Sequence, residues 1–137
     1  MNPPSVLLDL TFLTAVADPD DDNHEEATAI YRGLIDDFLA QRNLLVGRAD
    51  HLATVARADL FAPVDKLHVA GQHRHAAQEL MKRTDAGIDE AITLVLIKRC
   101  KIRKVATYDE RLRRYDFELV TASSPVPATA DVDASTT

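Results

Sequence analysis

A chain of 137 residues has the size of one ordinary domain, and with 46% apolar residues it can bury a sizeable core. Its formal net charge of −6 argues against strong non-specific binding to nucleic acid, which requires a basic face. No apolar run approaches the length of a membrane span, and the start, MNPPSV, lacks the basic segment of a signal peptide, so we expect no contact with a membrane.

The chain contains a single cysteine, Cys100, which excludes an internal disulfide bond. One unpaired cysteine fits a reducing compartment, and we therefore expect a cytoplasmic protein. Because Cys100 belongs to an apolar helical pattern, we interpret it as a small core residue rather than a reactive thiol.

Charges are unevenly distributed along the chain. Residues 18–26 (DPDDDNHEE) are strongly acidic, and two further acids, Asp131 and Asp133, lie near the C-terminus. An acidic protein can still present a basic rim, although a solvated helix end and loop would have the same composition. The candidate basic residues are Lys98, Arg99, Lys101, Arg103, Lys104, Arg111, Arg113 and Arg114.

The first predicted element is a strand at residues 5–10, the apolar run SVLLDL. A strand that is apolar on both faces is typical of a buried strand in a parallel sheet. One carboxylate, Asp9, lies near its end, and burying a carboxylate is unfavourable unless another group pairs with it or ligates to it. Asp9 is therefore the first candidate for chemistry.

The first half of the chain continues with helical spacing. A short helix is expected at residues 12–17, and after a loop the clearest helical stripe covers residues 24–42. A short strand follows at residues 44–46, where Gly47 is expected to break it. Helical spacing then resumes over residues 49–61.

The second half begins less regularly, since residues 64–83 show a helical face only toward their end. A second strong helix is predicted at residues 88–100 and a strand at residues 104–108. Residues 111–115 are expected to form a short basic helix or turn, and residues 117–121 form the last predicted strand.

Strands that alternate with helices predict an α/β domain with three α/β/α layers and a parallel sheet of four to five strands. We expect this domain to cover residues 1–121. Residues 122–137, rich in Ala, Ser, Pro and Thr, are expected to form a disordered tail. In such sheets, ligands bind at the carboxyl ends of the strands.

Several carboxylates are expected at this edge. Asp9 lies near the end of the first strand, Asp109 directly follows the strand at residues 104–108, and Asp89 and Glu90 open the preceding helix. Carboxylates that converge without a cation repel one another, and a divalent cation resolves this repulsion. Mg²⁺ and Mn²⁺ prefer oxygen ligands and can activate water for phosphodiester cleavage. Each acid alone would also be an ordinary helix cap or first-turn residue, so the hypothesis depends on their convergence.

Three segments are together similar to the PIN-domain family: the strand VLLDLTFL, the acidic loop ending in HEEA and the block DEAITLVLIKRCKIRKVATYDERL. The most similar type is the VapC toxin ribonucleases of bacterial toxin–antitoxin systems. The resemblance covers the layout of residues 5–120. It implies a five-stranded parallel sheet, Mg²⁺ or Mn²⁺ held by acidic residues, cleavage of RNA in single-stranded regions, frequent homodimers and inhibition by a protein antitoxin.

The resemblance assigns Asp9 to the first family acid, with Thr11 as the hydroxyl residue after it, and Asp109 to the last acid. The acid at the start of the long helix stays open, because counting back from Asp109 favours Glu90 whereas residue type favours Asp89. We assign catalysis to Asp9, Asp89 and Asp109, and metal binding to these three residues and Glu90.

One family acid is missing from the sequence. Thr54 stands where the second family acid, a glutamate, is expected, and Asp50 and Asp59 lie nearby but out of register. The leading hypothesis is a metal-dependent endoribonuclease, the toxin of a toxin–antitoxin pair, in which metal-activated water hydrolyses RNA phosphodiesters and basic residues hold phosphates. The alternative is a catalytically impaired PIN-like binding or scaffold protein. The phosphate-binding candidates are Arg111, Arg113 and Arg114.

Overall fold

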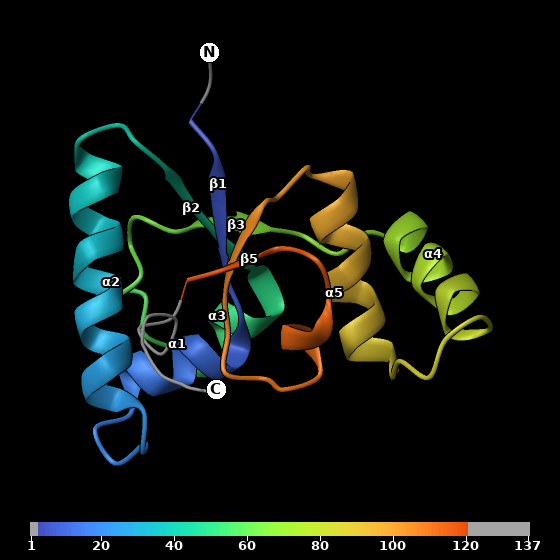
Figure 1. The fold of residues 1–137 in the computed structure, drawn as a ribbon, viewed down its shortest axis with the longest axis horizontal. Helices are drawn as coiled ribbons and strands as arrows, with labels where there is room; N and C mark the ends of the chain where they lie inside the picture. The colour runs from blue at the N-terminus through green and yellow to red at the C-terminus, as the bar shows by residue number, and fades with distance from the viewer. Residues whose placement is uncertain (1–2, 121–137) are drawn as a thin grey trace.

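Strand β1 is the centre of a five-stranded parallel sheet in the computed structural model, which describes residues 3–120 (Figure 1). The order β3-β2-β1-β4-β5 means that successive strands are added first on one side of β1 and then on the other. The predicted parallel sheet is therefore confirmed. The strands are β1 (Ser5–Leu8), β2 (Leu44–Arg48), β3 (Asp65–Leu67), β4 (Lys104–Ala106) and β5 (Glu118–Leu119).

Helices cover both faces of this sheet, as the three-layer prediction required (Figure 1). One face packs against α1, α2 and α3, and the other against α5, which in turn packs against α4. The helices are α1 (Leu10–Ala17), α2 (His24–Leu39), α3 (Ala49–Val55), α4 (Gly71–Met81) and α5 (Ile88–Arg99), with a 3₁₀ turn η1 at Leu112–Arg114.

The side chains of β1 alternate between the two cores. Val6 and Leu8 belong to the cluster that includes Phe12 of α1, whereas Leu7 packs with Ile97 of α5. All three strand residues are at most 1% exposed. The strand is therefore apolar on both faces because each face packs against a layer of helices, as the sequence predicted.

Gly47 does not break β2, so that prediction is wrong. It lies within the strand and is paired with Lys66 of β3. A Cβ atom at this position would lie 3.4 Å from Leu52 Cδ1 and from Val64 Cγ1. These are ordinary van der Waals distances, so Gly47 lies beside Leu52 of α3 within a continuous strand and forms no turn.

The strand β3 was not predicted, and the helix expected at residues 49–61 is shorter than its pattern. Helix α3 ends at Val55, because Ala56 adopts a left-handed conformation with φ of 57°. The first two residues of β3, Asp65 and Lys66, are both exposed. This edge strand therefore lacks the alternation of apolar and polar residues by which strands are recognised in a sequence.

Cys100 is exposed, and its prediction as a core residue is wrong. Helix α5 ends at Arg99, and Lys101 turns the chain with φ of 55°, which returns Ile102 rather than Cys100 to the core. The predicted tail at residues 122–137 lies outside the described residues. Over residues 3–120, no helix combines the length and apolar character needed to cross a membrane.

Candidate active site

The carboxyl ends of β1, β2 and β4 meet the N-terminal end of α5 at the lower edge of the sheet in Figure 1. Polar residues follow the apolar part of each strand there. Asp9 follows β1, Arg48 ends β2, and Thr107 follows β4, and each is at most 5% exposed. The site is built from these buried polar groups and from acids at the start of α5.

Asp9 is the N-cap of α1, and its carboxylate is also fixed from across the sheet. Its Oδ2 accepts hydrogen bonds from Thr107 Oγ1 at 2.9 Å and from Thr11 Oγ1 at 3.0 Å. The capping contact from the Thr11 amide is longer, at 3.4 Å. Two hydroxyl groups therefore hold this buried carboxylate more closely than the helix terminus does.

The Thr107 hydroxyl joins Asp9 to the region of Asp109. It donates to Asp9 and accepts a hydrogen bond of 2.9 Å from the Asp109 amide. Asp109 Oδ1 in turn accepts from the Arg111 amide at 2.9 Å. Asp9, through its carboxylate, and Asp109, through its backbone amide, thus contact the same fully buried hydroxyl.

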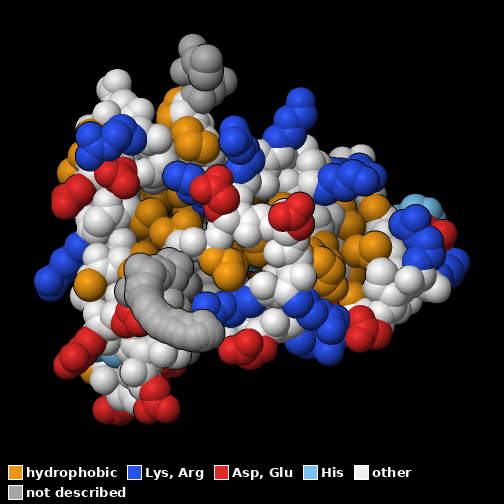
Figure 2. Space-filling view, in the orientation of Figure 1, with side chains coloured by type: hydrophobic (Ala, Val, Ile, Leu, Met, Phe, Trp, Pro, Cys, Tyr) orange, Lys and Arg blue, Asp and Glu red, His pale blue; other side chains and the backbone are white. Residues whose placement is uncertain are grey.

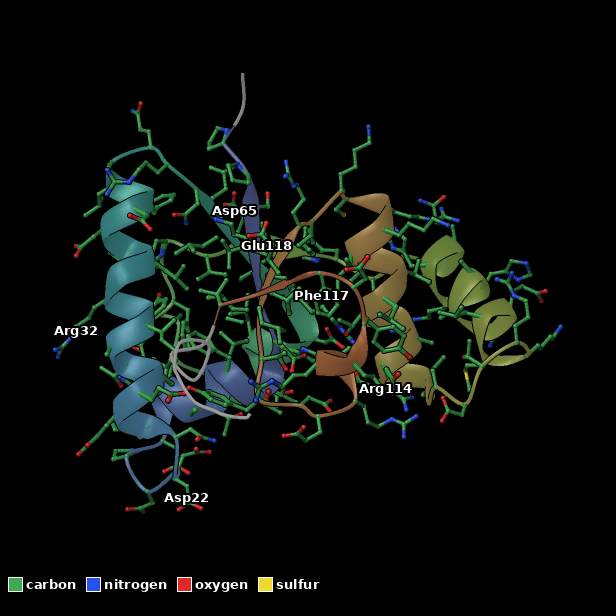
Figure 3. All side chains as sticks on the ribbon, in the orientation of Figure 1. Asp22, Arg32, Asp65, Arg114, Phe117 and Glu118 are labelled. Atoms are coloured by element: carbon green, nitrogen blue, oxygen red, sulfur yellow. The ribbon has the colours of Figure 1, made fainter. Side chains whose placement is uncertain are left out.

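Glu90 is the buried acid of α5, with 8% of its surface exposed. Its Oε1 accepts from Arg111 Nε, its Oε2 accepts from the Tyr115 hydroxyl, and Arg114 Nη2 lies 3.9 Å from Oε2. Figure 3 shows Arg114 beside the N-terminal part of α5. Burial raises the pKa of Glu90, but the hydrogen bonds from Tyr115 and Arg111 and the arginine charges outweigh it, so its pKa lies below the usual range.

Asp89 points to a different cation. Its Oδ1 lies 2.9 Å from Nη1 of Arg48, which is buried, and 3.3 Å from Nε2 of His51. The hydrogen bond from His51 and the Arg48 charge hold the pKa of Asp89 below its usual range against the effect of burial. Arg48 also donates to Asp50 and to Thr93 Oγ1, so it ties β2 to both α3 and α5.

The predicted acids therefore fall into two groups. Asp9, Asp109 and Glu90 are linked through Thr107 and Arg111, whereas Asp89 lies with Arg48 in the second group. Of the two acids near the position of the missing glutamate, Asp50 joins Asp89, and Asp59 instead pairs with Arg57 at the surface. Thr54 is exposed, and its hydroxyl donates to the Asp50 carbonyl.

Sequence reasoning missed three residues of the site: Arg48, His51 and Thr107. Arg48 and Thr107 carried the same signal as Asp9, since each is a polar residue at the end of an otherwise apolar strand. His51 had no such signal, because its place beside Asp89 depends on how α3 packs against α5.

Over the described residues, one cluster brings three potential metal ligands close together, and it does not include Asp9, Asp109 or Glu90. In this cluster Asp50, His51 and Asp89 can each offer one ligand atom, with all three atoms within 4.8 Å of one another, but Arg48 already pairs with both acids. In the first group, the hydrogen bonds use Oδ2 of Asp9 and Oδ1 of Asp109, which leaves the second oxygen of each carboxylate for a ligand. Mg²⁺ is commonly held by one or two carboxylates and otherwise keeps its water.

No protein-family model matches the sequence, and no curated protein matches it either. The solved structures that share this fold include the following two. VapC20 from Mycobacterium tuberculosis, a toxin that cleaves the sarcin–ricin loop, has a TM-score of 0.68 and 14% identity over 85% of this chain and 99% of its own. VapBC2 from Rickettsia felis, bound to a DNA fragment from its promoter, has a TM-score of 0.58 and 13% identity over 84% of this chain and 96% of the other. The likeness confirms the fold, which is that of the VapC toxins.

Proposed function

We propose that this chain, built on the fold of the VapC toxins, is a metal-dependent endoribonuclease and the toxin of a toxin–antitoxin pair. One observation carries the proposal: a single buried hydroxyl, on Thr107, donates to the Asp9 carboxylate and accepts from the Asp109 backbone amide, so both residues lie at the carboxyl edge of the sheet. The same edge holds Glu90 through Arg111. Acids at the ends of adjacent parallel strands are well placed to act on one ligand.

In this proposal Asp9 and Asp109 hold Mg²⁺ or Mn²⁺, and Glu90 is the third acidic residue of the site. Asp89 remains a candidate ligand through its own group with Asp50 and His51. When bound, the cation would supply Lewis acidity for activating water and positive charge toward the phosphodiester. Thr107 orients the Asp9 carboxylate by donating to Oδ2, and in this proposal the other oxygen, Oδ1, binds the ligand.

The basic residues after Asp109 would position the RNA. Arg111 and Arg114 expose 48% and 47% of their side chains, so each can meet a phosphate while keeping its contact with an acid. Such contacts position a nucleic acid without reading its sequence. We further propose a protein antitoxin as partner, because one structure of this fold is a VapBC complex, and a homodimer as the assembly.

The test is cleavage of a mixed RNA pool by the purified full chain with Mn²⁺, with EDTA, and with single variants. Asp9→Asn and Asp109→Asn are expected to lower the rate at least a hundredfold, while Asp59→Asn, a surface acid paired with Arg57, is the matched control and keeps wild-type activity. Glu90→Gln compared with Asp89→Asn identifies the third acid. Cleavage by folded Asp9→Asn at the wild-type rate, or cleavage that persists in EDTA, would contradict the proposal.

A catalytically impaired binding protein is the second candidate, and one specific observation favours it. The other acids of the edge already have internal cations: Arg48 neutralises Asp50 and Asp89, and Arg111 neutralises Glu90. Titration with Mn²⁺ by calorimetry separates the two candidates. An impaired site should show no binding that depends on Asp9, whereas the nuclease should lose binding with Asp9→Asn.

A further inference from the structure

The fold divides the basic segment of residues 98–114 into two surfaces. Residues 111–114 lie at the carboxyl edge, beside Glu90. Residues 98–104 lie at the opposite edge, where α5 ends and β4 begins. Figure 2 shows several Lys and Arg side chains around this connection, at the upper edge of the molecule. We call residues 98–104 the basic edge; its cations are Lys98, Arg99, Lys101, Arg103 and Lys104.

These cations have no partners among the described residues. Lys104 is half-buried and the others are exposed, and none of the five side chains forms a hydrogen bond or ion pair within residues 3–120. Even Lys104, whose register partner on β5 is Glu118, forms no ion pair with it. By contrast, Arg111 pairs with Glu90 and Arg114 pairs with Asp85. Five unneutralised charges within seven residues are unusual in a protein whose net charge is −6.

Local structure explains only part of this charge. Lys98 and Arg99 occupy the last turn of α5, where cations are favourable near the negative end of the helix dipole. The remaining three cations lie beyond the helix. Lys101 adopts φ of 55°, a left-handed conformation that is unfavourable for a non-glycine residue and that glycine would adopt freely. The fold therefore does not require a lysine at this position.

We propose that the basic edge is a second nucleic-acid contact that binds the phosphate backbone of a single strand, without a metal and without base recognition. Within residues 98–104 charge is available, but an exposed large apolar side chain is not. The one large apolar residue in this run, Ile102, is buried with 6% of its surface exposed. A protein partner would need a desolvated apolar or aromatic anchor, whereas a polyphosphate is bound by charge alone.

This inference goes beyond the proposed nuclease activity and does not depend on it. The α5 helix has 12 residues, so its two ends are about 18 Å apart. A strand of nucleic acid on the basic edge can therefore continue along the molecule toward the carboxyl edge. Binding is measured in EDTA, where metal-dependent cleavage does not occur, so loss of cleavage and loss of this contact are distinguishable.

The binding experiment uses fluorescence anisotropy with an unstructured 20-nucleotide RNA, and a DNA of the same sequence, on the full chain in EDTA. Lys101→Glu/Arg103→Glu is expected to weaken binding at least tenfold. It should also reduce the slope of log affinity against log salt by about 1.4, because each lost single-strand phosphate contact contributes about 0.7. The matched control is Arg74→Glu/Arg83→Glu, which changes the net charge equally at two exposed arginines of α4 and the following turn, and should stay within threefold of wild type.

The proposal would be overturned by equal weakening in both double variants, or by no binding of the wild-type chain at low salt. It would also be overturned if RNA bound tenfold more tightly than DNA, because the protein would then recognise more than phosphate. If Lys101→Glu/Arg103→Glu does not fold, Lys101→Gly/Arg103→Gln replaces it, since glycine suits the local backbone. This second variant is expected to show the same tenfold loss.

The single cysteine reports where the strand binds. Cys100 is exposed and lies within the basic edge, so its reaction with the uncharged reagent N-ethylmaleimide can be followed by mass spectrometry. Saturating RNA at low salt is expected to slow this reaction at least threefold, and high salt should restore it. Tight RNA binding that leaves the rate unchanged would place the nucleic acid elsewhere and contradict the proposal.

Discussion

Thr107 carries a fully buried hydroxyl that forms hydrogen bonds with two acidic residues of the site, Asp9 and Asp109. We predict that Thr107→Val, which keeps the shape and removes the hydroxyl, lowers the free energy of unfolding by about 1–3 kcal/mol. The loss follows because Asp9 loses a donor and the Asp109 amide loses its acceptor. Thr54→Val is the matched control at an exposed position and should change the free energy by less than about 0.5 kcal/mol in urea unfolding. Equal effects of the two variants would contradict this role.

Glu90 makes the stability depend on pH. Because its pKa is lower in the folded protein than its usual value, Glu90 contributes stability above the unfolded pKa of about 4.3, and this contribution is lost as the pH falls through the folded pKa. We predict that Glu90→Gln is less stable than wild type by about 1–3 kcal/mol at neutral pH, and that the difference shrinks below about pH 4. Urea unfolding at several pH values between about 2 and 7, which covers the titration range of carboxylates, measures this stability difference. A difference that stays constant with pH would mean that the charge of Glu90 is not involved.

At the residue scale, the sequence was informative where a polar side chain interrupts an apolar strand. This signal identified Asp9 correctly as a buried strand-end carboxylate, and the same signal is present at Arg48 and Thr107, which are also buried. It could not separate Asp89 from Glu90, because neighbouring positions on a helix differ by about 100° in direction and only packing decides which side chain is buried. In the structure Glu90 faces inward and Asp89 is 68% exposed.

At the element scale, Arg48 is the charge that connects β2 to α3 and α5. We predict that Arg48→Met lowers the free energy of unfolding by about 1–3 kcal/mol and leaves Asp50, His51 and Asp89 without their internal cation. In an Asp9→Asn background, Mn²⁺ should therefore raise the melting temperature of Arg48→Met more than that of the Arg48 parent. Arg57→Met, which breaks the surface pair with Asp59, is the control and should gain no response to Mn²⁺. No response from folded Arg48→Met would show that the three side chains do not form a metal site.

The end of α3 allows a test in which two similar substitutions act in opposite directions. Ala56 holds a left-handed conformation with φ of 57°, whereas the exposed Ala53 is helical. We predict that Ala56→Gly raises the free energy of unfolding by about 0.5–1 kcal/mol, because glycine adopts this backbone freely, and that Ala53→Gly lowers it by a similar amount. Thermal and urea unfolding measure both. Destabilisation by Ala56→Gly would mean that its methyl group contributes more by packing than it costs in strain.

At the scale of the whole molecule, alternation of helices with apolar strands was sufficient to predict the layers and the parallel sheet. The exceptions have a common physical cause. Edge strand β3 contributes little apolar surface, and the turn at Lys101 exposes Cys100 despite a continuous helical pattern. Likewise, residues 98–114 form one basic run in the sequence but occupy opposite edges of the sheet, because β4 crosses the molecule between them. Such features depend on where the chain turns, which periodicity does not determine.

The two basic surfaces lead to a prediction for the whole molecule, which rests on both proposals above. A contact far from the reacting phosphate binds substrate and transition state equally, so its loss raises KM and leaves kcat unchanged. Lys101→Glu/Arg103→Glu should therefore raise KM for RNA cleavage about tenfold at unchanged kcat, and added salt should reduce the difference from wild type. Asp109→Asn, at the carboxyl edge, should instead lower kcat. Steady-state cleavage of a short RNA at several salt concentrations measures both constants, and a fall in kcat for the basic-edge variant would show that this edge takes part in the chemical step.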